Sequence, residues 1–215
     1  MKDKTFLITR PKHEPTTSYL HYWSQRLIES AEAKGAKVLD ISDVKAVRKE
    51  FEGRVKKMIP DYLHLNGHGT SQTVMGHDNK VILDTKNSKM LKNKITYALS
   101  CDSAAGLGPQ AVKDGAKAYV GYDKEFYFAT NNHANTHPLD DESAAFFLEP
   151  AMKFSEEILK GKSVDVAAEK TKQAFDESIL KAANSEVQTG YAGYVKYLLW
   201  DKHYLAVYGK GKAAA

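Results

Sequence analysis

Short apolar runs alternate with amphipathic segments along the chain from residue 5 to residue 122. The apolar runs have the length and composition of buried strands, whereas the amphipathic segments repeat their apolar residues at helical spacing. This alternation predicts an α/β fold in which helices cover both faces of a mostly parallel sheet, a three-layer α-β-α sandwich. The expected strands are 5–9, 36–41, 62–66, 94–100 and 116–122. The expected helices between them lie in 18–35, 47–59 and 107–115. In the last segment, Pro109 lies near the start of the helix and Gly115 follows its end.

The remaining segments contain no internal repeat and no low-complexity linker. Residues 73–83 predict a hairpin with His-Asp-Asn at its tip. A polar loop without periodicity spans 123–141, and two helices are expected over 141–160 and 163–184. Residues 195–209 fit either two strands or the end of a helix followed by one strand.

We interpret residues 1–212 as a single domain and the alanines 213–215 as a cloning remnant without fold information. A length of 215 residues is sufficient for a substantial buried core. The single cysteine, Cys101, excludes an intrachain disulfide and suits a reducing compartment. The start of the chain, MKDKTFLITR, lacks the long apolar core of a signal peptide, so we expect a cytoplasmic protein by default, with the mature form of a secreted precursor as the alternative.

The charge pattern argues against two classes of partner. The net charge is only +4, the lysines are spread along the chain, and we find no basic stripe with interleaved aromatic residues, so nucleic-acid binding is not expected. No apolar run approaches the roughly 18–20 residues that cross a bilayer, so no membrane association is expected either.

Two reactive side chains follow the ends of expected strands. His68 lies between Gly67 and Gly69 after the third strand, and Cys101 directly follows the fourth. In parallel sheets the functional crevice lies at the carboxyl ends of the strands, so both side chains share one edge if these strands are neighbours. A lone cysteine is usually a small buried apolar residue, and Gly-His-Gly can be only a turn. The polar context Ser-Cys-Asp-Ser, 100–103, favours a loop over the core.

Together these residues fit the requirements of a cysteine peptidase. An imidazole lowers the pKa of a nearby thiol and serves as general acid for the leaving amine. Backbone N–H groups must also bind the oxyanion, and Gly69 and Cys101 are the natural donors. Histidine precedes cysteine in the chain, the reverse of the papain order, which excludes that fold.

The pattern of an apolar strand ending in His68-Gly69, a hairpin, and an apolar strand ending in Ser100-Cys101 resembles the caspase–gingipain–legumain superfamily. The stretch YALSCDSAAGLGPQAVKDGAKAYVGY is most similar to gingipain-type and CHAT-type members. The resemblance covers residues 5–122 in element order, with its specific residues in 62–70 and 98–121. It implies a central six-stranded sheet and endopeptidase activity, with His68 as general acid/base, Cys101 as nucleophile, and the Gly69 and Cys101 amides as the oxyanion hole.

The chain departs from the superfamily pattern at two positions. Metacaspase-type members carry an aspartate two residues before the cysteine, where this chain has Leu99. Gingipain-like chains often end their last strand with Gly-Asp-Pro, of which only Gly209 is present. The first difference leaves the substrate preference open.

Other polar residues near the expected edge are candidates for supporting roles. Asp123 follows the fifth strand and, with Asp102 and Glu125, is a candidate for a pocket that binds a Lys or Arg side chain before the scissile bond. The alternative, which the sequence slightly favours, is a helix cap or a solvated surface carboxylate. Asn66 is a candidate for orienting the His68 imidazole, or an ordinary residue at a strand end.

Three alternatives accompany the peptidase hypothesis. A metal site built from His64, His68, His77 and Asp78 is not favoured, because His64 lies inside a strand and no established ligand spacing is present, so we expect neither a metal nor another cofactor. A non-catalytic caspase-like or flavodoxin-like module could bind a ligand at the same sheet edge. In the third alternative, a regulatory protein gates the peptidase activity. The expected partner of a peptidase is a polypeptide substrate.

Overall fold

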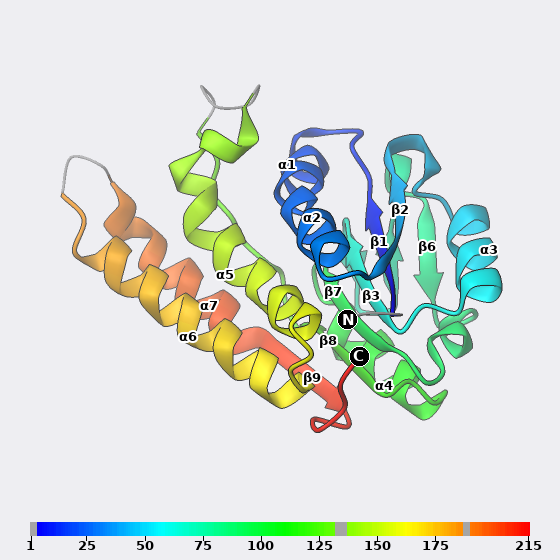
Figure 1. The fold of residues 1–215 in the computed structure, drawn as a ribbon. Coiled ribbons are helices and arrows are strands. Elements are labelled where there is room, and N and C mark those ends of the chain that lie inside the picture. Colours follow the sequence, from blue (N-terminus) through cyan, green and yellow to red (C-terminus); the bar gives the residue numbers. More distant parts are fainter. Residues whose placement is uncertain (1–3, 132–136, 187–189) are drawn as a thin grey trace.

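The computed structural model describes the whole chain except residues 1–3, 132–136 and 187–189. Its central sheet consists of β1 (Thr5–Arg10), β2 (Lys37–Ser42), β3 (Tyr62–Asn66), β7 (Ile95–Leu99), β8 (Ala118–Tyr122) and β9 (Leu205–Gly209). The strand order is β2-β1-β3-β7-β8-β9, and every neighbouring pair is parallel except β8 and β9 (Figure 1). The predicted fold class, a mostly parallel six-stranded sheet, is confirmed.

Helices cover both faces of this sheet. Figure 1 shows one group on one side, namely α1 (Pro15–Trp23), α2 (Gln25–Ala33), α5 (Glu142–Leu159), α6 (Val164–Ala183) and α7 (Val195–Tyr204). On the other side lie α3 (Arg48–Met58) and α4 (Ser103–Lys113). Two separate apolar cores fill the space between the sheet and these layers.

The strands supply side chains to both cores because successive residues point to opposite faces. Phe6 and Ile8 of β1 pack in the core beneath α1, α2 and α5, whereas Leu7 packs in the core beneath α3 and α4. All five residues of β3, β7 and β8 are buried. Because helices cover both faces, these strands consist mostly of apolar residues, as in other parallel sheets that are buried on both sides.

The less regular segments follow the sequence pattern in most places. The predicted hairpin is present as β5 (Thr73–Met75) and β6 (Val81–Asp84), with His77–Asn79 at its tip. The strand β4 (Gly69–Thr70) pairs with β5 and was not predicted. At the end of the chain, the second alternative is correct, because α7 is followed by the single strand β9.

The boundaries of two predicted helices differ in the structure. The predicted helix 18–35 is divided into α1 and α2 at Ser24, whose hydroxyl donates to the Leu20 carbonyl at 2.7 Å. The helix α4 begins at Ser103, so Pro109 lies inside it rather than near its start. Asp102 turns the chain directly into the helix with a φ of 56°, a turn that side-chain periodicity does not reveal.

The tail of the chain contacts the start of α6. The Gly211 and Ala213 carbonyls accept the N–H groups of Asp165 and Val164, at 2.8 and 2.9 Å. These bonds satisfy amides that a helix leaves without intrahelical partners. Ala213 thus takes part in the fold, contrary to our expectation for the final alanines. Among the described helices, none has the combination of length and apolar composition that would cross a membrane.

Candidate active site

The strands that precede His68 and Cys101 are direct neighbours. β3 and β7 pair in parallel, with Asn66 opposite Leu99 in the register. His68 and Cys101 each lie two residues beyond this pair, so both follow the same edge of the sheet. The predicted adjacency of the two strand ends is confirmed.

The glycines around His68 are required by the backbone. Gly67 has a φ of +141°, and a Cβ atom built there would lie 2.1 Å from the Met75 carbonyl oxygen. A Cβ atom on Gly69 would lie 2.6 Å from the Cys101 carbonyl oxygen and 3.0 Å from the Ser100 hydroxyl. Only glycine fits at either position, and Gly69 brings the backbone after His68 against the backbone of Cys101.

The β4–β5 pairing also orients the Gly69 amide. The Met75 N–H donates to the His68 carbonyl at 2.8 Å, which makes these two residues a hydrogen-bonded pair. In an antiparallel ladder the next pair, Gly69 and Val74, is then a non-hydrogen-bonded pair. The Gly69 N–H therefore points away from β5, as a donor to an external acceptor must.

The partner of the His68 imidazole is Glu14, a residue that the sequence analysis did not single out. The His68 Nε2 lies 3.4 Å from the Glu14 Oε1, and 38% of the His68 side chain is exposed. Glu14 is the N-cap of α1, and its carboxylate accepts the N–H groups of Thr16 and Thr17 at 2.9 and 2.6 Å. The sequence Glu-Pro-Thr-Thr directly after β1 was the available signal, because an acidic residue before a proline marks a helix start.

The environment of Glu14 favours its ionised form. Partial burial by itself raises the pKa of the Glu14 carboxyl, but the hydrogen bonds from Thr17 and Thr16 and the charge of His68 bring this pKa below its usual value. Glu14 is therefore a fixed carboxylate beside the imidazole at neutral pH.

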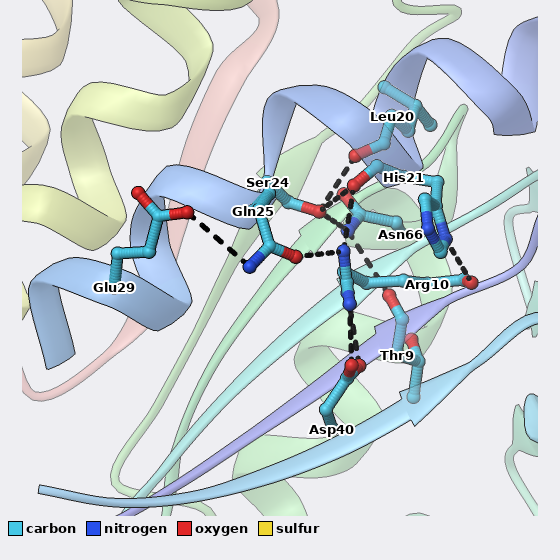
Figure 2. A network of polar contacts seen from close by, with 9 residues as sticks. All are labelled: Thr9, Arg10, Leu20, His21, Ser24, Gln25, Glu29, Asp40 and Asn66. Atoms are coloured by element: carbon cyan, nitrogen blue, oxygen red, sulfur yellow. Dashed lines mark hydrogen bonds and ion pairs between the residues drawn. The ribbon is translucent and has the colours of Figure 1, made fainter. Parts of the chain in front are cut away.

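Asn66 has a different role from the one that we considered. Its carboxamide oxygen accepts from His64 Nε2 at 2.8 Å, and its NH₂ group donates to the Thr9 carbonyl and the Ser24 hydroxyl (Figure 2). Asn66 thus orients the imidazole of His64, which is buried, and not that of His68. Burial lowers the pKa of His64 to about 4, so His64 is neutral and structural.

A buried arginine beside Asn66 fixes α1 and α2 on the same edge of the sheet. Figure 2 shows the Arg10 guanidinium between the Asp40 carboxylate, the His21 carbonyl and the Gln25 side chain, with donor–acceptor distances of 2.5–3.0 Å. A bidentate arginine–carboxylate pair imposes a defined geometry. This network connects β1 and β2 with α1, the helix whose N-cap is Glu14.

Cys101 lies at the junction of β7 and α4. Its side chain is half-buried, and its sulfur lies 3.9 Å from the Phe126 carbonyl oxygen. Burial raises the pKa of the Cys101 thiol, and the negative charges of Asp102, Glu125 and Asp201 raise it further. In this conformation Cys101 is therefore a neutral thiol at neutral pH.

The three carboxylates proposed for a pocket lie in different surroundings. Both oxygens of Asp123 accept from the Tyr208 hydroxyl, at 3.1 and 3.2 Å, and Tyr208 packs against the core on the α3 and α4 side. Asp102 is the partly buried N-cap of α4 and makes no side-chain capping bond. Glu125 is exposed and accepts from the Tyr127 hydroxyl at 2.5 Å. Asp102 and Glu125 lie near enough to Cys101 to affect its titration.

A fourth carboxylate near Cys101 was missed in the sequence. Asp201 of α7 is fully buried, and its Oδ1 accepts the Tyr127 N–H at 3.0 Å. Burial raises the pKa of Asp201 to about 8. The available signal was a charged residue within the apolar run YLLWDKHYLAVY, the segment for which the sequence left two alternatives open.

The histidines considered for a metal site are separated by the fold. His64 is bonded to Ser155 and Asn66, His68 lies against Glu14, and His77 lies against Asp43 and Asp78. Within the described parts of the chain, no group of three or more His, Cys, Asp or Glu residues has the arrangement of a metal site.

Comparison with known proteins identifies the fold. No protein-family model and no curated protein matches the sequence. Among solved structures, the Arg-specific cysteine proteinase gingipain R matches with a TM-score of 0.62 and 12% identity over 99% of this chain and 47% of its own. The complex of the Porphyromonas gingivalis RgpB pro- and mature domains matches with a TM-score of 0.60 and 11% identity, over 99% and 48%. The chain spans about half the length of these proteins and has their caspase-like fold.

Proposed function

We propose that this chain is a cysteine endopeptidase that hydrolyses peptide bonds through a Cys101–His68 dyad. The observation that carries the proposal is the meeting of His68-Gly69 and Cys101 at the ends of neighbouring parallel strands, with Gly69 against the Cys101 backbone. The fold shared with gingipain R supports it. The partner is a polypeptide substrate, and no cofactor is required for this chemistry.

The mechanism follows from the roles that these groups are suited to. His68 takes the proton of Cys101, and the sulfur attacks the carbonyl carbon of the scissile bond. The amides of Gly69 and Cys101 donate to the developing oxyanion. His68 then gives the proton to the leaving amine, and water hydrolyses the acyl-enzyme in a second step that the same imidazole assists.

The thiol must be uncovered before it reacts. The Phe126 carbonyl lies beside the sulfur, where a substrate carbonyl would have to approach, and nearby carboxylates disfavour a thiolate. Substrate binding, or a regulatory protein, would have to displace this segment. The same observation favours a second candidate function, a non-catalytic binding module in which Cys101 is a structural thiol.

A cleavage profile separates the two functions. We expect the protein to cleave a peptide library that varies the residue before the scissile bond, with a preference for basic residues because carboxylates surround Cys101. We expect iodoacetamide to label native Cys101 slowly, because the thiol is neutral and covered in this conformation, and to abolish this cleavage. Mass spectrometry measures both. Absence of cleavage, together with labelling of Cys101 only after denaturation, would instead establish the binding module.

Glu14 is proposed as the residue that positions His68. Glu14→Gln keeps the cap of α1 but removes the negative charge 3.4 Å from the imidazole. Partners that orient metal-binding histidines contribute roughly 10- to 100-fold in activity, and by analogy we expect kcat to fall by about this factor with KM unchanged. The control Glu32→Gln, an exposed residue of α2, should leave kcat unchanged. If activity falls only as far as the lowered melting temperature of Glu14→Gln accounts for, Glu14 only stabilises α1.

A further inference from the structure

The strand β2 forms one edge of the central sheet, and among the described strands it pairs only with β1. The Lys37 N–H donates to the Lys4 carbonyl at 2.8 Å, so every second residue from Lys37 bonds toward β1. The backbone groups of Val38, Asp40 and Ser42 therefore point outward, and they have no backbone partner among the described residues. Such an unpaired row of donors and acceptors is a template for an additional strand.

A groove of about 520 Å³ lies between this edge and α3. Leu39 of β2, with Gly53 and Met58 of α3, contributes to its apolar lining. Figure 1 shows α3 beside β2 on one side of the sheet. Because α3 connects the parallel strands β2 and β3, it runs antiparallel to β2. An extended segment paired with β2 would therefore lie along this groove, with every second side chain facing it.

Gly53 has no packing reason to be a glycine. A Cβ atom built there would have nothing within 4 Å, and its φ is not positive. A glycine inside a helix is destabilising relative to alanine. The missing side chain leaves the groove open at the middle of α3. A local cost without a packing reason indicates that the open space itself is used.

The groove carries a net positive charge. Lys49 and Lys57 are exposed and line the groove, four residues before and after Gly53, so the three share one side of α3. The two lysines are separated by about 12 Å along the helix. Neither takes part in an ion pair with another described residue. Glu50 and Arg54 also line the groove but pair with each other at 3.6 Å. The groove thus favours a negatively charged occupant.

Exposed apolar side chains follow both elements that form the groove. Among the described large apolar residues, Ile59 and Val44 have the greatest exposed fractions, 70% and 64%. Val44 follows the end of β2 and Ile59 follows the end of α3, and these two elements run in opposite directions. Ile59 also has a φ of 46°, a strained conformation for a β-branched residue. Both side chains extend the apolar surface that a strand added to β2 would cover.

We propose that β2 and α3 form a docking site for an extended acidic segment of a partner protein, which adds to β2 as a further strand. One apolar side chain of this segment enters the groove over Gly53. Carboxylates two residues before and after it project to the same face and lie about 13 Å apart, which matches the separation of Lys49 and Lys57. Only a polypeptide backbone supplies the alternating donors and acceptors that the outward groups of β2 require.

A second copy of this chain is the less suitable occupant. Two β2 edges that pair about a two-fold axis bring both α3 helices to the same face of the joined sheet. Lys49 and Lys57 of each copy would then approach a helix of the same charge, and like charges repel. The edge therefore discriminates in favour of an acidic partner.

The groove is tested with the peptide Thr-Glu-Thr-Leu-Thr-Glu-Thr, blocked at both ends, labelled with fluorescein and added to the intact protein. Fluorescence anisotropy should show saturable binding to the wild type. Gly53→Leu fills the groove and should weaken binding by at least about tenfold. It should not lower the melting temperature, because its Cβ atom meets nothing within 4 Å. The control Ala183→Leu, at an exposed position of α6, should bind as the wild type does. Equal affinity of Gly53→Leu and the wild type, or no binding to the wild type, would overturn the assignment.

The contacts of the lysines are tested by single charge removals. Lys57→Gln should weaken binding about two- to fivefold, the range of an exposed ion pair. Lys56→Gln removes the same charge from the preceding residue of α3, which does not line the groove, and should weaken binding less. A peptide with Gln in place of both Glu residues should bind the wild type and Lys57→Gln equally. An equal loss in Lys56→Gln, or a loss that persists with the Gln peptide, contradicts the proposed contacts.

Backbone pairing is tested by N-methylation of the peptide at alternate amides. Only every second amide of an added strand faces β2, so methylation of one alternate set should abolish binding and methylation of the other set should be tolerated. Equal effects of both sets contradict strand addition. Light scattering distinguishes the two occupants, because a wild-type dimer that Gly53→Leu converts to monomers would show that a second copy occupies the groove instead.

Discussion

Replacing either Cys101 or His68 with alanine should lower kcat/KM for peptide cleavage by at least about 10³-fold. The reason is chemical, because without the sulfur no acyl-enzyme forms, and without the imidazole the proton of the thiol has no acceptor and the leaving amine has no donor. Both side chains lie on the edge of the sheet, so the variants should keep the wild-type fold.

The double variant is the sharper measurement. Cys101 and His68 act as a unit, so the double alanine variant should be no slower than the slower single variant. His203→Ala, an exposed histidine of α7, is the control and should keep wild-type kcat/KM. Steady-state kinetics with circular dichroism as a folding check measures these effects. Cleavage at the wild-type rate by Cys101→Ala would exclude this nucleophile, and additive losses would show that the two residues do not cooperate.

Gly67→Ala should destabilise the protein by about 2–4 kcal/mol, the range in which strained or overpacked backbone positions fall. A Cβ atom at this position would overlap the Met75 carbonyl at 2.1 Å, and the φ of +141° is unfavourable for any residue with a side chain. Relief of the overlap has to move β5 away from His68, so activity should also be lost.

Alanine variants of two other glycines separate the cost of the backbone conformation from the cost of the overlap with Met75. Gly161 has a φ of +80° but no atom within 4 Å of a built Cβ, so Gly161→Ala reports the cost of the backbone conformation alone. Gly53 lies inside α3 with nothing within 4 Å, and Gly53→Ala should stabilise the protein by about 0.5–1 kcal/mol. Urea unfolding measures the three free energies. If Gly67→Ala costs no more than Gly161→Ala, the contact with Met75 is not a constraint.

The order of the layers and the place of the reactive side chains could be predicted from the sequence because both depend on local patterns. Apolar runs of strand length between amphipathic segments define a parallel sheet, and a residue that follows a strand in such a sheet is assigned to one of its edges. This is why the adjacency of His68 and Cys101 was predictable. The start of α4 was not, because it depends on the left-handed conformation of Asp102, which leaves no periodic signal.

The residues around His68 and Cys101 come from contacts between distant segments of the chain. Glu14 meets His68 because the first turn of α1 is held over the end of β3, and Asp201 lies near Cys101 because α7 packs its inner face on the same layer. Asn66 points into the core toward His64, although it lies as close to His68 in the chain. Such contacts join segments far apart in the sequence, and they depend on how helices sit on the sheet. Local sequence patterns predict that His68 and Cys101 lie on one edge of the sheet, and the packing of α1 and α7 selects the carboxylates beside them.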